Sequence, residues 1–428
     1  MRLCIRSGRI IDPANHRDET GGVLIEDGII AAVGPEADAP DACETIDASG
    51  LWVTPGWIDL HTHLREPGFE YKETVYQGAG AALKGGFTTI CAMPNTNPVT
   101  DCAEIVNFVH AKAQEAGGAR VLPIGSLTEG QKGARLSRME DMAAAGVCAF
   151  SEDGKSVADA FLMKEALRKS GTLGLPVFLH CEEPSLVRGG VMHESAAARR
   201  LGLPSISADA EEVIIARDLI LAQYADVHIH ICHISTAGGV RLLRQAKQAG
   251  VRASGEVCPH HFTLCCEDIP GDDGMYKMNP PLRSARDRLA LWEGLADGTI
   301  DAIATDHAPH APEEKNKGFM GSAFGVAGLE TALALCVTRL VRPKILTPSQ
   351  LIQKCAANPA KILGIGAGTL SVGARADITL IDPQKEIMVN PETFFSKGKN
   401  TPFGGWKLIG AVVCTIMDGR IVYANDHR

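Results

Sequence analysis

The chain has 428 residues, of which 45% are apolar and 22% are charged, a composition typical of soluble globular proteins and not of disordered, collagenous or membrane-spanning chains. The formal net charge is −9 and no Lys/Arg-rich run occurs, which argues against nucleic acids and membranes as partners. Thirteen scattered cysteines do not form a disulfide pattern, so we expect them to be reduced and mostly buried in a cytoplasmic protein.

The two ends of the chain predict short β-strands. The first 55 residues contain apolar segments broken by Gly, Asp-Pro and Asp-Gly turns, at 3–5, 9–11, 23–26 and 29–33. The last part of the chain has the same character, with apolar segments at 376–381, 412–417 and 421–423. Because two strand-rich ends flank one long middle, we expect residues 1–55 and 366–428 to build a small β-sandwich domain together.

The middle of the chain, residues 56–365, alternates between short apolar segments and Ala-rich helical stretches. Successive apolar segments follow one another at roughly 25–50 residues, which suits a strand plus a crossover helix. Eight of them are predicted strands: 56–60, 88–93, 120–125, 146–150, 176–179, 227–231, 252–257 and 300–304. Eight such units predict an α/β fold with a closed (β/α)₈ TIM-like barrel, and an open doubly wound sheet is the alternative.

The active site of such a barrel lies at the C-terminal ends of its strands. Histidines or carboxylates follow five of the predicted strands, namely His61 and His63, Asp153, His180, His233 and Asp306. Four imidazoles with carboxylates suit a borderline divalent cation such as Zn²⁺, and a carboxylate between two metals could bridge them. The His-Thr-His segment alone could be a polar pair on a strand, but the matching strand ends favour a metal site.

The alternation of side chains along a strand also predicts which way the histidines point. Side chains at i and i+2 face the same side, so His61 and His63 should point together, with Asp59 behind them on the same face. His233 has the parity opposite to that of His228 and His230. We therefore expect these two histidines to face the helices and not to bind the metal.

Several segments then resemble one known family. Residues 56–68, Gly-Trp-Ile-Asp-Leu-His-Thr-His-Leu-Arg-Glu-Pro-Gly, resemble the opening signature of the cyclic amidohydrolases, and of dihydroorotases in particular. Residues 306–310 resemble their second signature, and four further segments resemble bacterial class I dihydroorotases, at 92–96, 151–154, 233–237 and 278–283. The resemblance covers nearly the whole chain. It implies zinc-dependent, reversible hydrolysis of dihydroorotate to N-carbamoyl-L-aspartate, which closes the ring in de novo pyrimidine (UMP) biosynthesis.

The resemblance also implies a role for each candidate ligand. The first metal would be held by His61, His63 and Asp306 and the second by His180 and His233, with Asp153 between them. Hydantoinases carry a carboxylated lysine at the position of Asp153, and the shorter side chain here leaves open one or two Zn²⁺ ions per subunit. Asp306 is the expected catalytic acid and base, which takes a proton from the attacking hydroxide and gives it to the leaving ring nitrogen.

A substrate carboxylate needs fixed positive donors inside an acidic protein. Arg65 offers a two-pronged guanidinium, and its alternative is a surface ion pair with Glu66 or Glu70. The family pattern adds substrate contacts from Asn95, Asn279 and His310 and from backbone groups of Phe324 and Gly325. Asn95 could instead be only a turn former, and His310 could instead cap a loop.

Other features stay open at this point. Alternation points Cys181 toward the helices, although a distorted loop could let its thiolate capture zinc. The polar segment 311–322 is either a lid over the site or a plain loop. His260 and His261 resemble the Pro-His-His of the family, without an expected ligand role. The alternative functions are a hydantoinase- or allantoinase-like amidohydrolase and a non-catalytic partner of aspartate transcarbamoylase, and the resemblance also allows a homo-oligomer.

Overall fold

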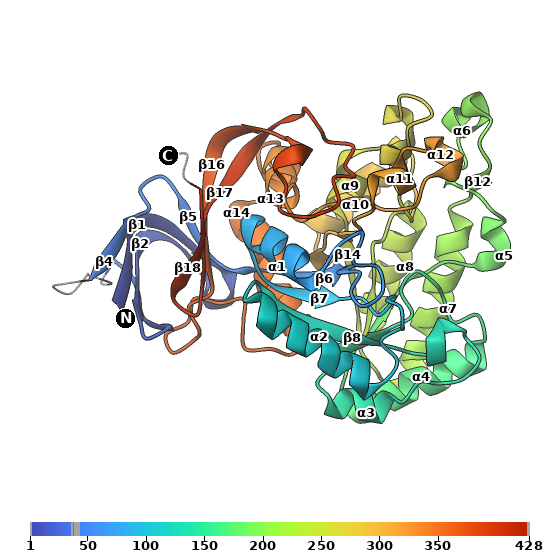
Figure 1. The fold of residues 1–428 in the computed structure, drawn as a ribbon, viewed down its shortest axis with the longest axis horizontal. Coiled ribbons are helices and arrows are strands. Elements are labelled where there is room, and N and C mark those ends of the chain that lie inside the picture. The colour runs from blue at the N-terminus through green and yellow to red at the C-terminus, as the bar shows by residue number, and fades with distance from the viewer. Residues whose placement is uncertain (1, 36, 38–42, 426–428) are drawn as a thin grey trace.

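The computed structural model describes residues 2–35, 37 and 43–425, and it contains a β domain and a barrel (Figure 1). Strands from both ends of the chain lie side by side in the β domain, at the left of Figure 1, while the middle of the chain forms the barrel at the right. The predicted β-sandwich from both termini and the predicted (β/α)₈ barrel are therefore confirmed. None of the described helices combines the length and the apolar character that a membrane span requires.

The β domain joins the two ends of the chain through one strand pair. Its strands are β1 (Arg2–Asp12), β2 (Arg17–Glu26), β3 (Ile29–Gly34), β4 (Glu44–Asp47), β5 (Trp52–Pro55), β16 (Ile378–Met388), β17 (Lys407–Met417) and β18 (Arg420–Ala424). The order is β18-β17-β16-β5-β1-β2-β3, with β4 beside β1, and β16 runs antiparallel to β5. Leu3, Ile5, Val53 and Ile378 pack in its core, so burial of apolar surface holds the two ends together.

One strand of this domain differs from its prediction. The segments 3–5 and 9–11 belong to a single strand, β1, because a bulge between Ile5 and Gly8 shifts the register against β2. Ser7 has a positive φ of 60° at this point. A bulge interrupts the apolar alternation without ending the strand, so the pattern looked like two strands.

All eight predicted barrel strands are present and parallel, in sequence order around the sheet. They are β6 (Trp57–Thr62), β7 (Phe87–Ala92), β8 (Arg120–Ser126), β9 (Ala149–Ser151), β10 (Val177–Leu179), β13 (Ile229–Ile231), β14 (Ala253–Val257) and β15 (Ala302–Ile303). A parallel bridge between Thr62 and His307 links the last strand to the first, and the His63 N–H donates to the His307 carbonyl at 2.8 Å. Strands such as β6 and β7 are buried throughout, which explains why apolar residues occur on both of their faces.

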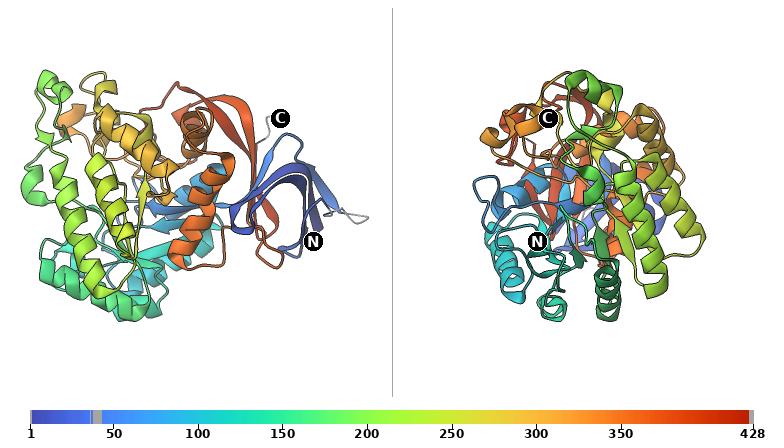
Figure 2. Two further views of the ribbon diagram at one scale, coloured as in Figure 1. Left: turned by 180° about the vertical axis from the view of Figure 1, so that it is seen from behind. Right: turned by 90° about the vertical axis from the view of Figure 1, so that its right-hand side faces the viewer.

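Helices surround the strands, as the right panel of Figure 2 shows from the end away from the β domain. The longer ones are α1 (Val75–Lys84), α2 (Ala103–Ala116), α4 (Ala160–Leu173), α7 (Asp209–Ala225), α8 (Ala237–Gln248) and α10 (Ala285–Ala296). Side chains cap several of their N-termini: Thr74 accepts from the Gln77 N–H before α1, and Ser284 and Asp287 form a capping box before α10. These caps make the helix starts predictable from the sequence.

Shorter elements complete the fold. The short α-helices are α3 (Met139–Ala144), α5 (Pro184–Val187), α6 (Ala196–Leu201), α9 (Pro259–Thr263), α11 (Pro312–Lys315), α12 (Gly318–Gly321), α13 (Ala332–Cys336), α14 (Pro348–Ile352) and α15 (Asn358–Leu363). A two-stranded sheet consists of β11 (Met192–His193) and β12 (Ser205–Ile206). The 3₁₀ segments are η1 (Pro13–Asn15), η2 (Glu129–Gln131), η3 (Cys266–Asp268), η4 (Gly274–Tyr276) and η7 (Pro391–Thr393), and two π-helical segments are η5 (Val337–Val341) and η6 (Gln353–Ala357).

Candidate metal centre and substrate pocket

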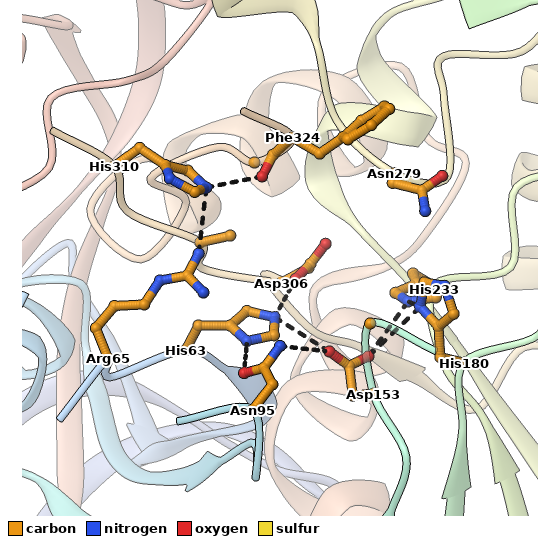
Figure 3. A pocket seen from close by; sticks show the side chains of 13 residues that line it. His63, Arg65, Asn95, Asp153, His180, His233, Asn279, Asp306, His310 and Phe324 are labelled. Atoms are coloured by element: carbon orange, nitrogen blue, oxygen red, sulfur yellow. Dashed lines mark hydrogen bonds and ion pairs between the residues drawn. The ribbon is translucent and has the colours of Figure 1, made fainter. Parts of the chain in front are cut away.

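The barrel strands bring the candidate site residues to one pocket of about 200 Å³ (Figure 3). This volume is below the range of roughly 300–1,000 Å³ that drug-sized ligands occupy, so the pocket suits one small molecule. Its lining contains His63, Arg65, Asn95, Asp153, Gly154, His180, His233, Asn279, Asp306, Ala308, His310, Phe324 and Gly325. His61, the remaining candidate, is fully buried beside His63, with 5.3 Å between the ring centroids.

Asp153 lies at the centre of the candidate ligands. Its Oδ1 atom is 3.2 Å from Nε2 of His61, 3.5 Å from Nδ1 of His180 and 3.7 Å from Nε2 of His233. Its Oδ2 atom is 3.5 Å from Nε2 of His63. One carboxylate therefore faces both histidine pairs, which is the position that a bridging ligand between two ions requires.

Asp306 faces the first histidine pair. Its Oδ1 atom is 3.0 Å from Nε2 of His63 and 3.5 Å from Nε2 of His61. On the other side of Asp153, Nδ1 of His180 and Nε2 of His233 are 3.0 Å apart. These nitrogen and oxygen atoms fit a metal centre, because the sets His61/His63/Asp306 and His61/Asp153/His233 each place three ligand atoms within 4.8 Å of one another.

Unpaired polar atoms support the same interpretation. His61 Nε2, Asp153 Oδ1 and His180 Nε2 are buried and form no hydrogen bond. Leaving such atoms without a partner costs about 1–3 kcal/mol each, so the occurrence of three of them in the candidate ligands needs an explanation. Imidazole and carboxylate groups are suitable ligands for a divalent cation.

The histidines of the centre lower the pKa of both carboxyl groups. Burial opposes ionisation of Asp306, but His61 and His63 outweigh it and hold the pKa of this carboxyl well below its usual range. The pKa of Asp153 is lowered in the same way, against burial, by His61, His180 and His233. Both carboxylates are thus charged at neutral pH, as metal ligands must be.

Backbone conformation aims some of these side chains. Arg65, His233 and Asp306 have positive φ values of 63°, 33° and 46°, at the points where the chain leaves β6, β13 and β15. Such conformations are rare for residues other than glycine and concentrate at functional sites. They turn the chain abruptly, so that the side chains enter the pocket instead of continuing the alternation of the strand.

The prediction that His230 faces the helices is wrong for this reason. His230 lies inside the barrel, where its ring packs against Phe178 and its Nε2 atom is 2.9 Å from Oε2 of Glu256. The alternation was counted backward from His233, which lies beyond the end of β13 and has a positive φ. His228 lies half-buried just before β13, and its Nε2 atom is 2.9 Å from the Ser254 hydroxyl, which is also 2.8 Å from Nδ1 of His230.

Glu256 is a residue of the site that the sequence reasoning missed. It is fully buried on β14, and its Oε1 atom is 2.9 Å from Nδ1 of His61. A carboxylate on the second ring nitrogen orients a metal-binding histidine and fixes its tautomer. The signal that could have found it is a charged residue inside a predicted strand that is otherwise small and apolar.

Asp59 and Asn95 support the centre from either side. Asp59 accepts from the His61 N–H at 3.0 Å and from the Thr305 hydroxyl at 2.6 Å, so it ties the end of β6 to the end of β15 as well as lying behind the ligands. Asn95 places Oδ1 2.9 Å from Nδ1 of His63 and Nδ2 3.5 Å from Oδ2 of Asp153. Asn95 is therefore more than a turn former.

Arg65 and His310 form the opposite wall of the pocket (Figure 3). Arg65 is partly buried and donates from Nε to the Pro309 carbonyl at 3.2 Å, and it forms no ion pair with Glu66 or Glu70. Its Nη2 atom is 3.3 Å from Nε2 of His310, which is also 2.8 Å from the Phe324 carbonyl. Burial, together with Arg65 and Lys72, lowers the pKa of His310 to about 3, so this ring is neutral at neutral pH.

Asn279 and Gly325 line a third side of the pocket, which offers one hydrogen-bond acceptor without a partner. Asn279 donates from Nδ2 to Glu182 at 2.8 Å, whereas its Oδ1 atom is buried without a partner at the pocket. The Gly325 N–H already donates to the Lys277 carbonyl at 3.0 Å. At Gly325, where φ is 147°, a Cβ atom would lie 2.6 Å from the Ala308 carbonyl oxygen, so glycine keeps this part of the pocket open.

The polar segment 311–322 is anchored beside the pocket. It contains α11 and α12, and Lys315 is buried there and donates to the carbonyls of Lys277, Ala323 and Gly325 at 2.8–3.0 Å. Cys181 packs between barrel and helices and does not line the pocket. Most of the thirteen cysteines are buried, as expected.

Comparisons with known proteins agree with this geometry. A family model described as dihydro-orotase-like matches residues 50–238, and an amidohydrolase family model matches residues 278–423. A dihydroorotase of Pelotomaculum thermopropionicum is 51% identical over 422 residues, which are 99% of this chain and 98% of that protein. A dihydroorotase of a Geobacillus species is 49% identical over 428 residues, which are 100% of both chains.

Solved structures are similar over the same length. An L-hydantoinase (dihydropyrimidinase) from Arthrobacter aurescens superposes with a TM-score of 0.88 at 25% identity, covering 99% of this chain and 96% of that one. A D-hydantoinase (dihydropyrimidinase) from a Thermus species has a TM-score of 0.83 at 26% identity, covering 99% and 95%. The β domain and the barrel are both included in these matches.

Proposed function

The chain belongs to the dihydroorotase family of the cyclic amidohydrolases, and we propose that it catalyses the reversible hydrolysis of dihydroorotate to N-carbamoyl-L-aspartate. One observation carries the proposal: the guanidinium of Arg65 and the candidate metal ligands line the same small pocket. A cyclic amide that bears a carboxylate needs both features. The relatives named dihydroorotase, at about half identity over their whole length, support the same substrate.

We propose Zn²⁺ as the metal, with one or two ions per subunit. His61, His63 and Asp306 would hold the first ion, His180 and His233 the second, and Asp153 would lie between them. When bound, the metal polarises the amide carbonyl and lowers the pKa of the attacking water. Glu256 and Asn95 would keep the Nδ1 protons of His61 and His63 in place, which leaves each Nε2 lone pair for the ion.

Asp306 is the proposed catalytic acid and base. It is ionised, it lines the pocket, and its Oδ1 atom is 3.0 Å from Nε2 of His63. As the water attacks the ring carbonyl, the carboxylate takes its proton and then gives it to the ring nitrogen when the C–N bond breaks. In the direction of ring closure the same carboxyl group returns the proton by the reverse path.

The remaining walls bind and orient the substrate. Arg65 would hold the carboxylate through parallel N–H donors, and Asn95 and His310 lie close enough to the same space to add contacts. The free Oδ1 of Asn279 can accept from a ring N–H. Phe324 and Gly325 would contact the ring through backbone groups, and Gly325 leaves room for it by having no side chain.

Two positions distinguish this site from that expected of a hydantoinase or an allantoinase. Hydantoin and allantoin carry no carboxylate, so an enzyme for them has no use for a buried guanidinium such as that of Arg65. Asp153 also stands where the hydantoinases of the family pattern have a carboxylated lysine. A purely non-catalytic partner of aspartate transcarbamoylase would not need the complete ligand set that lies around Asp153.

One assay tests the function. Turnover of dihydroorotate, hydantoin and allantoin is compared with the purified protein, before and after treatment with a chelator and after addition of Zn²⁺. We expect turnover of dihydroorotate that is lost with the metal and restored by Zn²⁺. Faster turnover of hydantoin or allantoin, or full activity of metal-free protein, would contradict the proposal.

Cytoplasmic location stays a prediction from the scattered, mostly buried cysteines. Homo-oligomer formation and association with aspartate transcarbamoylase likewise stay predictions from the family resemblance. We also propose that residues 56–365 form the catalytic unit, with residues 1–55 and 366–428 as the β domain.

A further inference from the structure

A second group of potential metal ligands lies at the C-terminal end of β14, and the proposed reaction does not use it. Cys258, His260 and His261 each place a ligand atom within 4.8 Å of the other two, the same limit that the catalytic sets meet. All three side chains are at most 3% exposed. The group shares no residue with the catalytic ligands, although it lies at the same strand-end rim of the barrel as they do.

Unpaired imidazole nitrogens single out this group. Among the described residues, buried ring nitrogens without a hydrogen bond occur in four histidines, of which His61 and His180 belong to the catalytic set. The other two atoms are Nε2 of His260 and Nδ1 of His261. Buried polar atoms nearly always have a hydrogen-bond partner. A cation beside each of these four histidines would explain all four unpaired ring nitrogens in the same way.

The tautomer of His261 is suited to binding a cation. Its Nε2 atom is 2.8 Å from the Pro280 carbonyl oxygen, which can only accept a hydrogen bond. The proton of the neutral ring must therefore be on Nε2, and Nδ1 has a free lone pair. A backbone carbonyl that accepts from one ring nitrogen while the other binds a metal is a common arrangement in metalloproteins.

The chemistry of the three side chains selects the kind of ion. The group offers two imidazoles, from His260 and His261, and the sulfur of Cys258. Two neutral imidazoles and one thiolate prefer a borderline or soft cation to Mg²⁺ or Ca²⁺. Binding of the cation would release the thiol proton of Cys258 to solvent, and the resulting thiolate would balance part of the charge.

We propose that Cys258, His260 and His261 form a structural binding site for a borderline-soft cation such as Zn²⁺, separate from the catalytic centre. The site would join the end of β14 and the start of α9 to the segment that contains Pro280. Asn279, the neighbour of Pro280, lines the substrate pocket. A cation at this place would therefore stabilise one wall of the pocket without touching the substrate.

Cobalt(II) provides a test that does not depend on activity. A thiolate bound to Co²⁺ produces a charge-transfer absorption in the near ultraviolet, whereas the proposed catalytic ligands are histidines and carboxylates only. Co²⁺ is titrated into metal-depleted full-length protein, and absorption and bound cobalt per chain are measured. We expect the band in the wild type and the loss of both the band and one equivalent of cobalt in Cys258→Ser.

Cys232 provides the matched control, because it also lies near two potential ligands, His61 and Glu256. A band that survives Cys232→Ser and disappears in Cys258→Ser supports the proposal. A band that disappears only in Cys232→Ser, or no band in the wild type, overturns it. If Cys258→Ser does not fold, His261→Gln and anomalous scattering at the cobalt edge decide, since a peak between the three side chains supports the site and its absence refutes it.

Discussion

Glu256 and His61, on β14 and β6, form a hydrogen bond in the interior of the barrel, with 2.9 Å between Oε1 and Nδ1 and both side chains fully buried. Burial opposes the charge of Glu256, but hydrogen bonds from His230 and His61 outweigh it and lower its pKa to about 2. A charged carboxylate on Nδ1 keeps the proton there, so Nε2 of His61 faces Asp153 with its lone pair.

Glu256→Gln should therefore weaken metal binding by roughly 10–100-fold, because the orientation and basicity of His61 depend on the carboxylate. The affinity is measured by competition with a chelator of known strength. Glu73→Gln is the matched control, since Glu73 is equally buried but binds Ser396 and the Lys397 N–H and contacts no candidate ligand. Equal metal affinity in Glu256→Gln and the wild type would refute the role of Glu256.

Asp306→Asn should lower kcat for dihydroorotate by about 10³-fold or more, because the amide cannot accept the proton of the attacking water. Circular dichroism and thermal unfolding should show an intact fold. Bound metal is measured in the same samples, so that loss of the ion and loss of the base can be separated. Turnover near that of the wild type would end the assignment of Asp306 as the base.

Arg65→Met should raise KM for dihydroorotate by about 10–100-fold, since a hydrogen bond to a charged group contributes roughly 1.5–3 kcal/mol. KM for dihydrouracil, the same ring without the carboxylate, should change much less. Arg120→Met is the control, because Arg120 pairs with Asp377 and Asp418 at the β domain and does not line the pocket. Equal effects of Arg65→Met on both substrates would mean that Arg65 does not bind the carboxylate.

His310 should make stability depend on pH. Its pKa is about 3 in the folded protein and near 6.5 in an unfolded chain, so between these values the unfolded state binds more protons. The free energy of unfolding therefore falls as the pH falls from about 6.5, with at most about 1.4 kcal/mol per pH unit from this one group.

His310→Gln removes this contribution, so its unfolding free energy should decline less steeply with acid than that of the wild type. Urea unfolding at several pH values measures both slopes. His16→Gln, at an exposed position of the β domain, controls for the general effect of replacing a histidine. Parallel slopes in His310→Gln and the wild type would show that the buried ring does not cause the dependence.

Much of the architecture could be predicted from the sequence. The eight barrel strands lie in mostly apolar segments because both faces of a parallel sheet are buried, and such segments are visible without a structure. Likewise, the ends of parallel strands meet at one rim, so His61, His180 and Asp306 could be assigned to one place from their positions alone. The positions of His233 and Asp153 at this rim follow from the same rule, although the roles of both residues stay predictions.

Other features could not be predicted because the strands are not regular at those positions. The alternation rule holds only inside a regular strand, so it failed for His230, which was counted from His233 beyond the end of β13. The bulge in β1 divided one strand into two apparent ones in the same way. Positive φ values and bulges arise where tertiary contacts outweigh local preference, and the local pattern does not record them.

The amino-acid sequence by itself determined the barrel, the β domain built from both termini and the group of side chains at the strand ends. Burial produces apolar patterns that can be read along the chain, and the direction of each strand tells which residues lie at its C-terminal end. Only the tertiary structure decided that Glu256 supports His61, that Asn95 supports His63, and that the rings of His260 and His261 have unpaired nitrogens. These relations are contacts between side chains from different strands and loops. Their distances are set by closure of the barrel and by packing, and no spacing in the sequence contains them.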